Sequence, residues 1–121
     1  MKKKLILSII FVIATFLIIY PIKYHGVYWA GFIWCKKSVP HACPHEVAHY
    51  ADDLMNFPSR SPEFREAAES IGLVFWNAPV EVYAELYTIA QGKEENMPEV
   101  LREFYNWELA DKLMEKYNGR Y

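Results

Sequence analysis

The sequence predicts a mainly α-helical fold, α+β at most, in which an N-terminal transmembrane helix precedes a compact helical domain with little or no sheet. Three observations lead to this prediction. The first is a run of apolar residues from Leu5 to Tyr20. The second is a series of later segments in which apolar residues recur at helical spacing. The third is the placement of prolines and glycines where such helices would start and stop.

The N-terminal run indicates a membrane segment. Carried on to residue 22, it would form a helix of about 27 Å, close to the thickness of one hydrocarbon core. Lysines at positions 2–4 predict that this end stays cytoplasmic and that the remainder is exported. We therefore expect a signal-anchor at 1–22 and a folded domain at 23–121, which predicts a single-pass cell-membrane protein with an extracytoplasmic domain. Secretion after signal cleavage is the alternative, although no small-residue cleavage pattern precedes Lys23.

The charge balance argues against nucleic acid as a partner. The chain has 121 residues, with 13 Lys and Arg against 15 Asp and Glu. Three of the basic residues are the lysines at positions 2–4, so the rest of the chain carries a net charge of −5. Nucleic-acid binding depends on clustered basic residues, which such a domain lacks. A domain of this size is also near the lower limit for a self-sufficient core, so a bound metal would help to hold it together.

The remaining elements follow in order. Residues 24–35 are aromatic and punctuated by glycine, which favours one short strand or hairpin arm. Residues 36–44 are expected to form a loop, in which Pro40 and Pro44 bound His41 and Cys43. Four helices are then predicted from apolar spacing and from their cap, proline or glycine boundaries. They run from Pro44 to about Phe57, from Pro62 to Ile71, from a start at Asn77 to about Gln91, and from about Pro98 to Tyr117.

The first of these helices carries the motif His45-Glu46-Val47-Ala48-His49. Positions i and i+4 lie one turn apart on the same helix face, so the two imidazoles can converge on one metal ion. Zinc accepts such ligands and keeps a position open for chemistry, and Glu46 would be placed to take a proton from water. The motif therefore indicates a metallohydrolase. The alternative is a helix start with two unrelated histidines and a glutamate that suits the helix dipole.

A third ligand is needed, and the third predicted helix offers Glu81 and Glu85 one turn apart. One carboxylate could bind the metal while the other orients a ligating imidazole. A solvated acidic helix face is the alternative. Against it, the neighbouring positions are strongly apolar, which suggests a helix buried on most sides, and buried carboxylates need partners.

These two segments, 45–53 and 81–87, resemble the gluzincin metallopeptidases, most closely the anthrax lethal factor-like peptidases and related small zincin domains. The resemblance implies one Zn²⁺ bound by His45, His49 and Glu81, with Glu46 as the general base and Glu85 as the partner that orients a ligand. It also implies a peptide or protein substrate.

Together the motif and the apolar leader predict a membrane-anchored zinc metallopeptidase, with membrane contact through the N-terminal helix. The alternative is a membrane-tethered, non-catalytic binding or inhibitory module with a structural or vestigial zinc site. The residue that would stabilise the oxyanion is left open among four candidates, Tyr50, Tyr83, Tyr87 and His41.

Cys35 and Cys43 are the two cysteines of the chain. Outside the cytoplasm they could close a short disulfide loop just before the metal motif. They could equally remain thiols that pack as small hydrophobic residues. A third interpretation makes Cys43 or His41 an accessory metal ligand.

Overall fold

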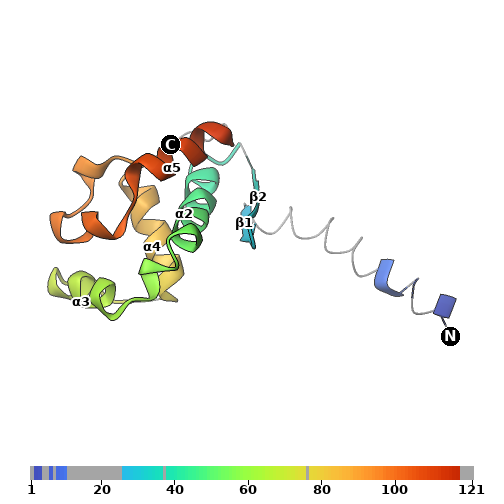
Figure 1. Cartoon of the computed structure of the whole chain (residues 1–121), viewed down its shortest axis with the longest axis horizontal. Coiled ribbons are helices and arrows are strands. Elements are labelled where there is room, and N and C mark those ends of the chain that lie inside the picture. Colours follow the sequence, from blue (N-terminus) through green and yellow to red (C-terminus); the bar gives the residue numbers. More distant parts are fainter. Residues whose placement is uncertain are drawn as a thin grey trace.

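The computed structural model describes residues 2, 3, 6, 8–10, 26–36, 38–75 and 77–117, and most of these are helical. The elements are β1 (Gly26–Trp29), β2 (Phe32–Cys35), α2 (Ala42–Leu54), η1 (Pro58–Arg60), α3 (Pro62–Ser70), α4 (Pro79–Ile89), η2 (Glu94–Asn96), η3 (Glu99–Phe104) and α5 (Trp107–Lys116). The centre is the pair α2 and α4, which lie side by side, with α5 across one end of the pair and α3 near the other (Figure 1).

The core lies between these helices because α2 is apolar on two of its faces. Ala48 belongs to one cluster of buried residues together with Tyr83, Ala84 and Tyr87 of α4. Val47 and Ala51 pack on the other side, against Leu113 and Met114 of α5. The remaining face of α2, which carries the histidines, is thereby turned toward the N-terminal part of α4 and the hairpin.

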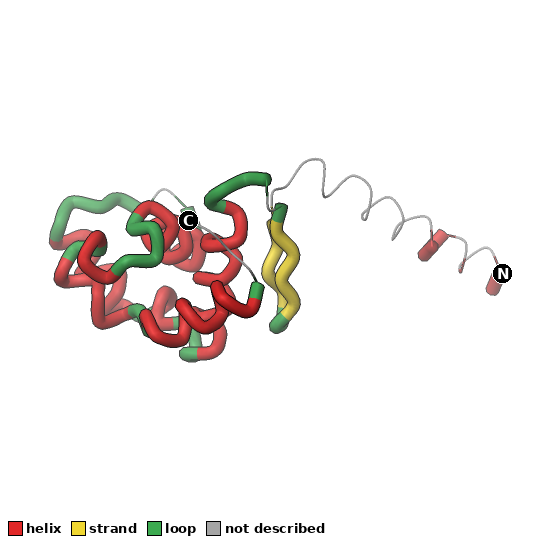
Figure 2. The backbone as a smooth tube through the Cα atoms, turned by 90° about the horizontal axis from the view of Figure 1, so that it is seen from above, coloured by secondary structure: helices red, strands yellow, loops and turns green. Residues whose placement is uncertain are grey.

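A β-hairpin stands beside α2, on the side away from α3 and η3 (Figure 2). Its strands are antiparallel, with Gly26 opposite Cys35 and Trp29 opposite Phe32. The two-residue turn Ala30-Gly31 has φ values of 46° and 87°, the left-handed pair that suits the twist of a tight hairpin. The aromatic sequence was expected to give one strand or hairpin arm, and both arms are present.

Several helix boundaries differ from the expectation. The helix expected to end at about Phe57 ends at Leu54, because Asn56 and Phe57 have φ values of 61° and 59°, outside the helical region. α2 begins at Ala42 rather than Pro44, which leaves the proline in the first turn, where a missing N–H costs no helical hydrogen bond. The expected helix from Pro98 to Tyr117 is wrong as one element. It divides into η3 and α5, and Asn106 caps α5 by accepting a hydrogen bond from Leu109 N at 3.0 Å.

The expected membrane segment requires a correction. Most of residues 1–22 lies outside the described residues. In the part of the chain that the structure does describe, no helix has the length and apolar character needed to cross a bilayer. This finding contradicts the expected architecture of a transmembrane helix before a helical domain, and with it the expected single-pass localisation. The described fold is a mainly helical domain with a small two-stranded sheet.

Candidate metal centre

The histidines of the motif lie one turn apart on α2, and their rings meet edge to face with centroids 4.8 Å apart. Their Nε2 atoms are 3.2 Å from each other. Both side chains are mostly covered, with 19% of His45 and 12% of His49 exposed. The i, i+4 spacing thus brings two ring nitrogens to one point, as the sequence predicts.

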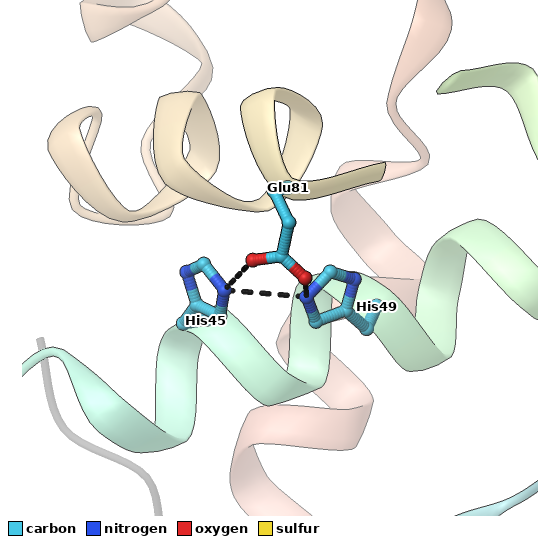
Figure 3. Close-up of side chains that lie close together, drawn as sticks. All are labelled: His45, His49 and Glu81. Atoms are coloured by element: carbon cyan, nitrogen blue, oxygen red, sulfur yellow. Dashed lines mark hydrogen bonds and ion pairs between the residues drawn. The ribbon is translucent and has the colours of Figure 1, made fainter. Parts of the chain in front are cut away.

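Glu81 projects from the first turn of α4 between the two imidazoles (Figure 3). Its Oε2 lies 3.0 Å from His45 Nε2, and its Oε1 lies 3.1 Å from His49 Nε2. Pro79 is at the start of α4, where its fixed φ suits the first helical position, and this sets Glu81 at the end facing α2. Two distant parts of the sequence therefore contribute to one cluster.

His45, His49 and Glu81 form a group that could hold a metal ion. Ligands about 2.0–2.2 Å from a tetrahedral zinc ion lie about 3.3–3.5 Å from one another. In this cluster the two Nε2 atoms are 3.2 Å apart, and a different oxygen of Glu81 lies beside each of them, at 3.0 Å from His45 and 3.1 Å from His49. One possible ligand atom from each of the three residues lies within 4.8 Å of the other two. The donor types and their proximity therefore suit a metal ion.

In the cluster, the carboxylate and the imidazoles each favour the charged form of the other. Hydrogen bonds from His45 and His49 hold the pKa of Glu81 far below its ordinary value, against the opposing effect of burial. Burial lowers the pKa of His45, but its bond to Glu81 and the nearby carboxylates outweigh this, so the net shift is upward. An anionic Glu81 facing two imidazoles is the charge arrangement expected of an ion-binding carboxylate.

Glu85 and Glu46 lie on either side of this cluster. Glu85 is one turn beyond Glu81 on α4, and its Oε2 is 3.5 Å from the second ring nitrogen of His45, Nδ1. Glu46 follows His45 and is only 8% exposed. Burial raises the pKa of Glu46, and the two imidazoles oppose this increase. The structure thus places all five predicted site residues around one point.

A pocket of about 560 Å³ opens at the cluster. The hairpin from Gly26 to Ala30 forms one wall, and α2 supplies the two histidines, Glu46 and Asp53. The wall beyond α2 consists of Phe57 and Arg60, which flank and end η1, together with the start of α4. The His45–His49–Glu81 cluster is therefore accessible from a space large enough for a short stretch of peptide.

Four lining residues, Tyr28, Asp53, Phe57 and Arg60, have no role that the sequence predicts. Tyr28 of β1 donates a hydrogen bond to Asp53 and accepts one from Gly31 N at 3.0 Å, which ties the hairpin to α2. Phe57 and Arg60 lie in the segment that the sequence marks only as a helix break. No periodic pattern identifies any of them, because each reaches the pocket through tertiary packing.

The expected oxyanion candidates lie elsewhere. Tyr83 and Tyr87 are 1% exposed in the core, and the Tyr83 hydroxyl donates to Phe104 O at 2.7 Å. Tyr50 stacks on Tyr28, and His41 lies at the exposed start of α2. Among the described residues that line the pocket, none of these four is present.

A disulfide joins Cys35 at the end of β2 to Cys43 in the first turn of α2. Of the alternatives for the two cysteines, the structure has the bridge. Cys43 is therefore not a metal ligand in this fold. The bridge fixes the hairpin to the helix two residues before His45, so it helps to position the wall of the pocket.

Comparisons of the chain with protein-family models, with curated proteins and with solved structures found no match.

Proposed function

We propose that this chain is a zinc-dependent metallopeptidase that hydrolyses peptide bonds, with Glu46 as its general base. The observation that carries the proposal is a three-donor cluster lining a pocket, beside a carboxylate that is almost fully withdrawn from water. Two imidazoles and one carboxylate form the ligand set of several catalytic zinc sites, and three protein ligands leave a position open.

The donor types favour zinc as the ion. Nitrogen ligands suit zinc, whereas calcium and magnesium prefer sites made wholly of oxygen. When bound, the ion would supply Lewis-acid chemistry, by polarising a carbonyl oxygen and lowering the pKa of a water molecule. Glu85 Oε2 lies 3.5 Å from His45 Nδ1, so with the ion bound it would favour a proton on Nδ1 and leave the Nε2 lone pair for the metal.

Glu46 performs the proton transfers in this proposal. It accepts a proton from water as the water oxygen attacks the peptide carbonyl carbon, and it then gives that proton to the leaving nitrogen as the C–N bond breaks. A base works best when its pKa is near the working pH, and burial raises the pKa of Glu46 from its ordinary range. Its place next to His45 sets it beside the ligand cluster.

Strand β1 supports a peptide as the substrate. Within the described part of the chain, β1 has only β2 as a sheet partner, and all of β1 lines the pocket. An extended peptide can pair with the edge of such a strand through main-chain hydrogen bonds. Main-chain pairing with β1 would align a peptide beside Glu46 whatever most of the peptide's side chains are.

The resemblance to the gluzincins belongs to the same proposal. It rests on the two histidines of α2 and on a third ligand, Glu81, that comes from a separate helix, α4. In this proposal the oxyanion would be stabilised by the metal and by groups that line the pocket, which do not include the core tyrosines Tyr83 and Tyr87.

The decisive experiment compares the full chain with Glu46→Gln. We expect both proteins to bind about one equivalent of zinc, and the variant to lose cleavage of a mixed peptide library by about 10²–10⁴-fold, the usual contribution of an acid–base residue. Glu66→Gln is the matched control, because Glu66 is an exposed glutamate of α3 outside the pocket. Zinc analysis by mass spectrometry and library cleavage by chromatography give the two readouts.

A third variant, His49→Ala, should lose the bound zinc. Equal cleavage by Glu46→Gln and the parent would contradict the role of Glu46. One equivalent of zinc with no cleavage of any peptide would refute the peptidase and leave a metal-stabilised binding module. A folded parent that binds no zinc would overturn the proposal as a whole.

A further inference from the structure

The segment after α2 is held in an unusual backbone conformation. Asn56 and Phe57 have φ values of 61° and 59°, in the left-handed region that residues with a Cβ rarely occupy. Asp52, which is fully buried, holds this segment in place. Its carbonyl accepts a hydrogen bond from Phe57 N at 2.7 Å, and its carboxylate accepts one from Ser59 N at 3.1 Å and another from the Ser59 hydroxyl. Such local strain, fixed by surrounding contacts, is often found at functional sites.

The result of this arrangement is that Arg60 and Phe57 line the pocket together. The Arg60 guanidinium carbon lies 3.9 Å from the centre of the Phe57 ring, so the planar group rests on the aromatic face. Stacking of this kind occupies the flat side of the guanidinium and leaves its N–H groups, which point outward in the plane, available for hydrogen bonds.

Arg60 is the only lysine or arginine among the described residues that line the pocket. The side chain is exposed, and no described carboxylate lies within ion-pair distance of it. Each acidic side chain that lines the pocket contacts a group other than Arg60. Glu81 faces the imidazoles, Glu46 is buried against the hairpin, and Asp53 accepts the hydrogen bond of Tyr28.

We propose that Arg60 is a specificity-determining residue that binds a carboxylate of the substrate. A guanidinium matches a carboxylate with two parallel hydrogen bonds, and here it is oriented beforehand by Phe57 and by the Asp52 bonds. The carboxylate belongs to an acidic side chain or to a free peptide C-terminus. Because Arg60 and the His45–His49–Glu81 cluster line the same pocket, the carboxylate lies close along the peptide to the cleaved bond. This inference rests on the proposed peptidase function.

The test measures peptide binding to zinc-loaded Glu46→Gln, which would bind substrate without cleaving it. Peptides carry Glu at one position or the isosteric Gln, and each is made with a free or an amidated C-terminus. We expect the preferred acidic peptide to bind about two- to fivefold more tightly than its neutral partner, the upper part of the range for an exposed ion pair. The Glu-to-Gln arm and the amidation arm show which carboxylate Arg60 binds.

Variants made in the same Glu46→Gln background assign the effect to one side chain. Arg60→Gln should bind acidic and neutral peptides equally and should keep its zinc. Arg65→Gln is the matched control and should keep the preference, because Arg65 also lies over an aromatic ring, at 4.8 Å from the centre of Phe75, but does not line the pocket.

Two results would overturn the inference, and they can be distinguished. If the zinc-loaded protein binds peptides but treats acidic and neutral forms alike, carboxylate recognition fails while the peptidase proposal stands. If it binds no peptide at all, both fail. A preference that survives in Arg60→Gln would also overturn the role of Arg60. Should Arg60→Gln lose its fold by circular dichroism, Arg60→Lys replaces it and should weaken the preference, because lysine keeps the charge but not the paired hydrogen bonds.

Discussion

Gly26, the first residue of β1, allows the hairpin to approach Glu46 closely. A Cβ atom at Gly26 would lie 2.8 Å from Glu46 Cγ and 3.2 Å from the main-chain oxygen of Trp34. Non-bonded carbon atoms pack at about 3.5–4.0 Å. Gly26→Ala therefore requires the strand or the Glu46 side chain to move by about 0.7 Å at least. The clashing atom is the middle of the side chain, so rotation of its tip alone cannot relieve the contact.

The expected cost follows from this overlap. Forcing an extra methyl group into a well-packed contact lowers the free energy of unfolding by about 1–3 kcal/mol. Displacement of a catalytic group by about 1 Å can lower kcat/KM by about 10²-fold. We expect Gly26→Ala to lose stability and peptide cleavage by these amounts. Zinc binding should stay near one equivalent, because the histidines and Glu81 are not the residues in contact with the new methyl group.

Denaturant unfolding, zinc analysis and peptide cleavage together measure this outcome. Gly31→Ala is the control from the same hairpin. Gly31 has φ of 87°, and a methyl group added there would have no neighbouring atom within 4 Å, so its substitution costs only backbone strain of about 1–2 kcal/mol. Its cleavage rate should match that of the parent. Parental stability and turnover in Gly26→Ala would refute the argument that this glycine positions the base.

Two further predictions concern the attachments of the hairpin. Reduction of the disulfide between Cys35 and Cys43 should lower the free energy of unfolding by about 2–3 kcal/mol, from the entropy of a short closed loop, and a double serine variant should not respond to reductant. An unchanged denaturation midpoint would contradict this. Burial, aided by the hydrogen bond to Asp53, raises the pKa of Tyr28 from 10.0 to about 12. The contribution of Tyr28 to the free energy of unfolding is therefore complete below pH 10 and is lost as the pH rises toward 12. Over this range the free energy of unfolding should depend less steeply on pH in Tyr28→Phe than in the parent, and equal slopes for the two proteins would contradict the prediction.

The parts of the site that the sequence predicts well are those encoded within one helix. The i, i+4 spacing of the histidines on α2 brings two ring nitrogens to one side of the candidate cluster by local geometry alone. Glu81 is different, because spacing along the chain does not specify which helix packs on α2. Its choice as a ligand came from a resemblance, and the packing of α4 on α2 now places its carboxylate oxygens 3.0 and 3.1 Å from the ring nitrogens.

The predicted continuous helix over 98–117 shows why other features of the fold cannot be predicted from the sequence. Its apolar spacing is real, yet the chain leaves the helix at Tyr105. That ring stacks on Tyr83 with centroids 4.0 Å apart, and its hydroxyl donates to Tyr83 O at 2.8 Å. A contact between residues 22 positions apart thus outweighs the local helical pattern, and Asn106 starts α5 afresh. The sequence does not predict the place of Phe57 and Arg60 in the pocket for the same reason, because the conformation of their segment depends on hydrogen bonds to Asp52.

The candidate metal cluster and the core depend on the same helix contact. Ala48 and Ala84 are buried to 1% and 0% exposure in the cluster of residues between α2 and α4. Small side chains at a helix crossing let the two axes approach closely, and the distance between packed helices follows the side chains at the contact. Ala48 directly precedes His49, and Ala84 is one turn beyond Glu81. The separation that these alanines permit is therefore what brings the short Glu81 side chain between the imidazoles, so the geometry of the ligands is set by the packing of the core.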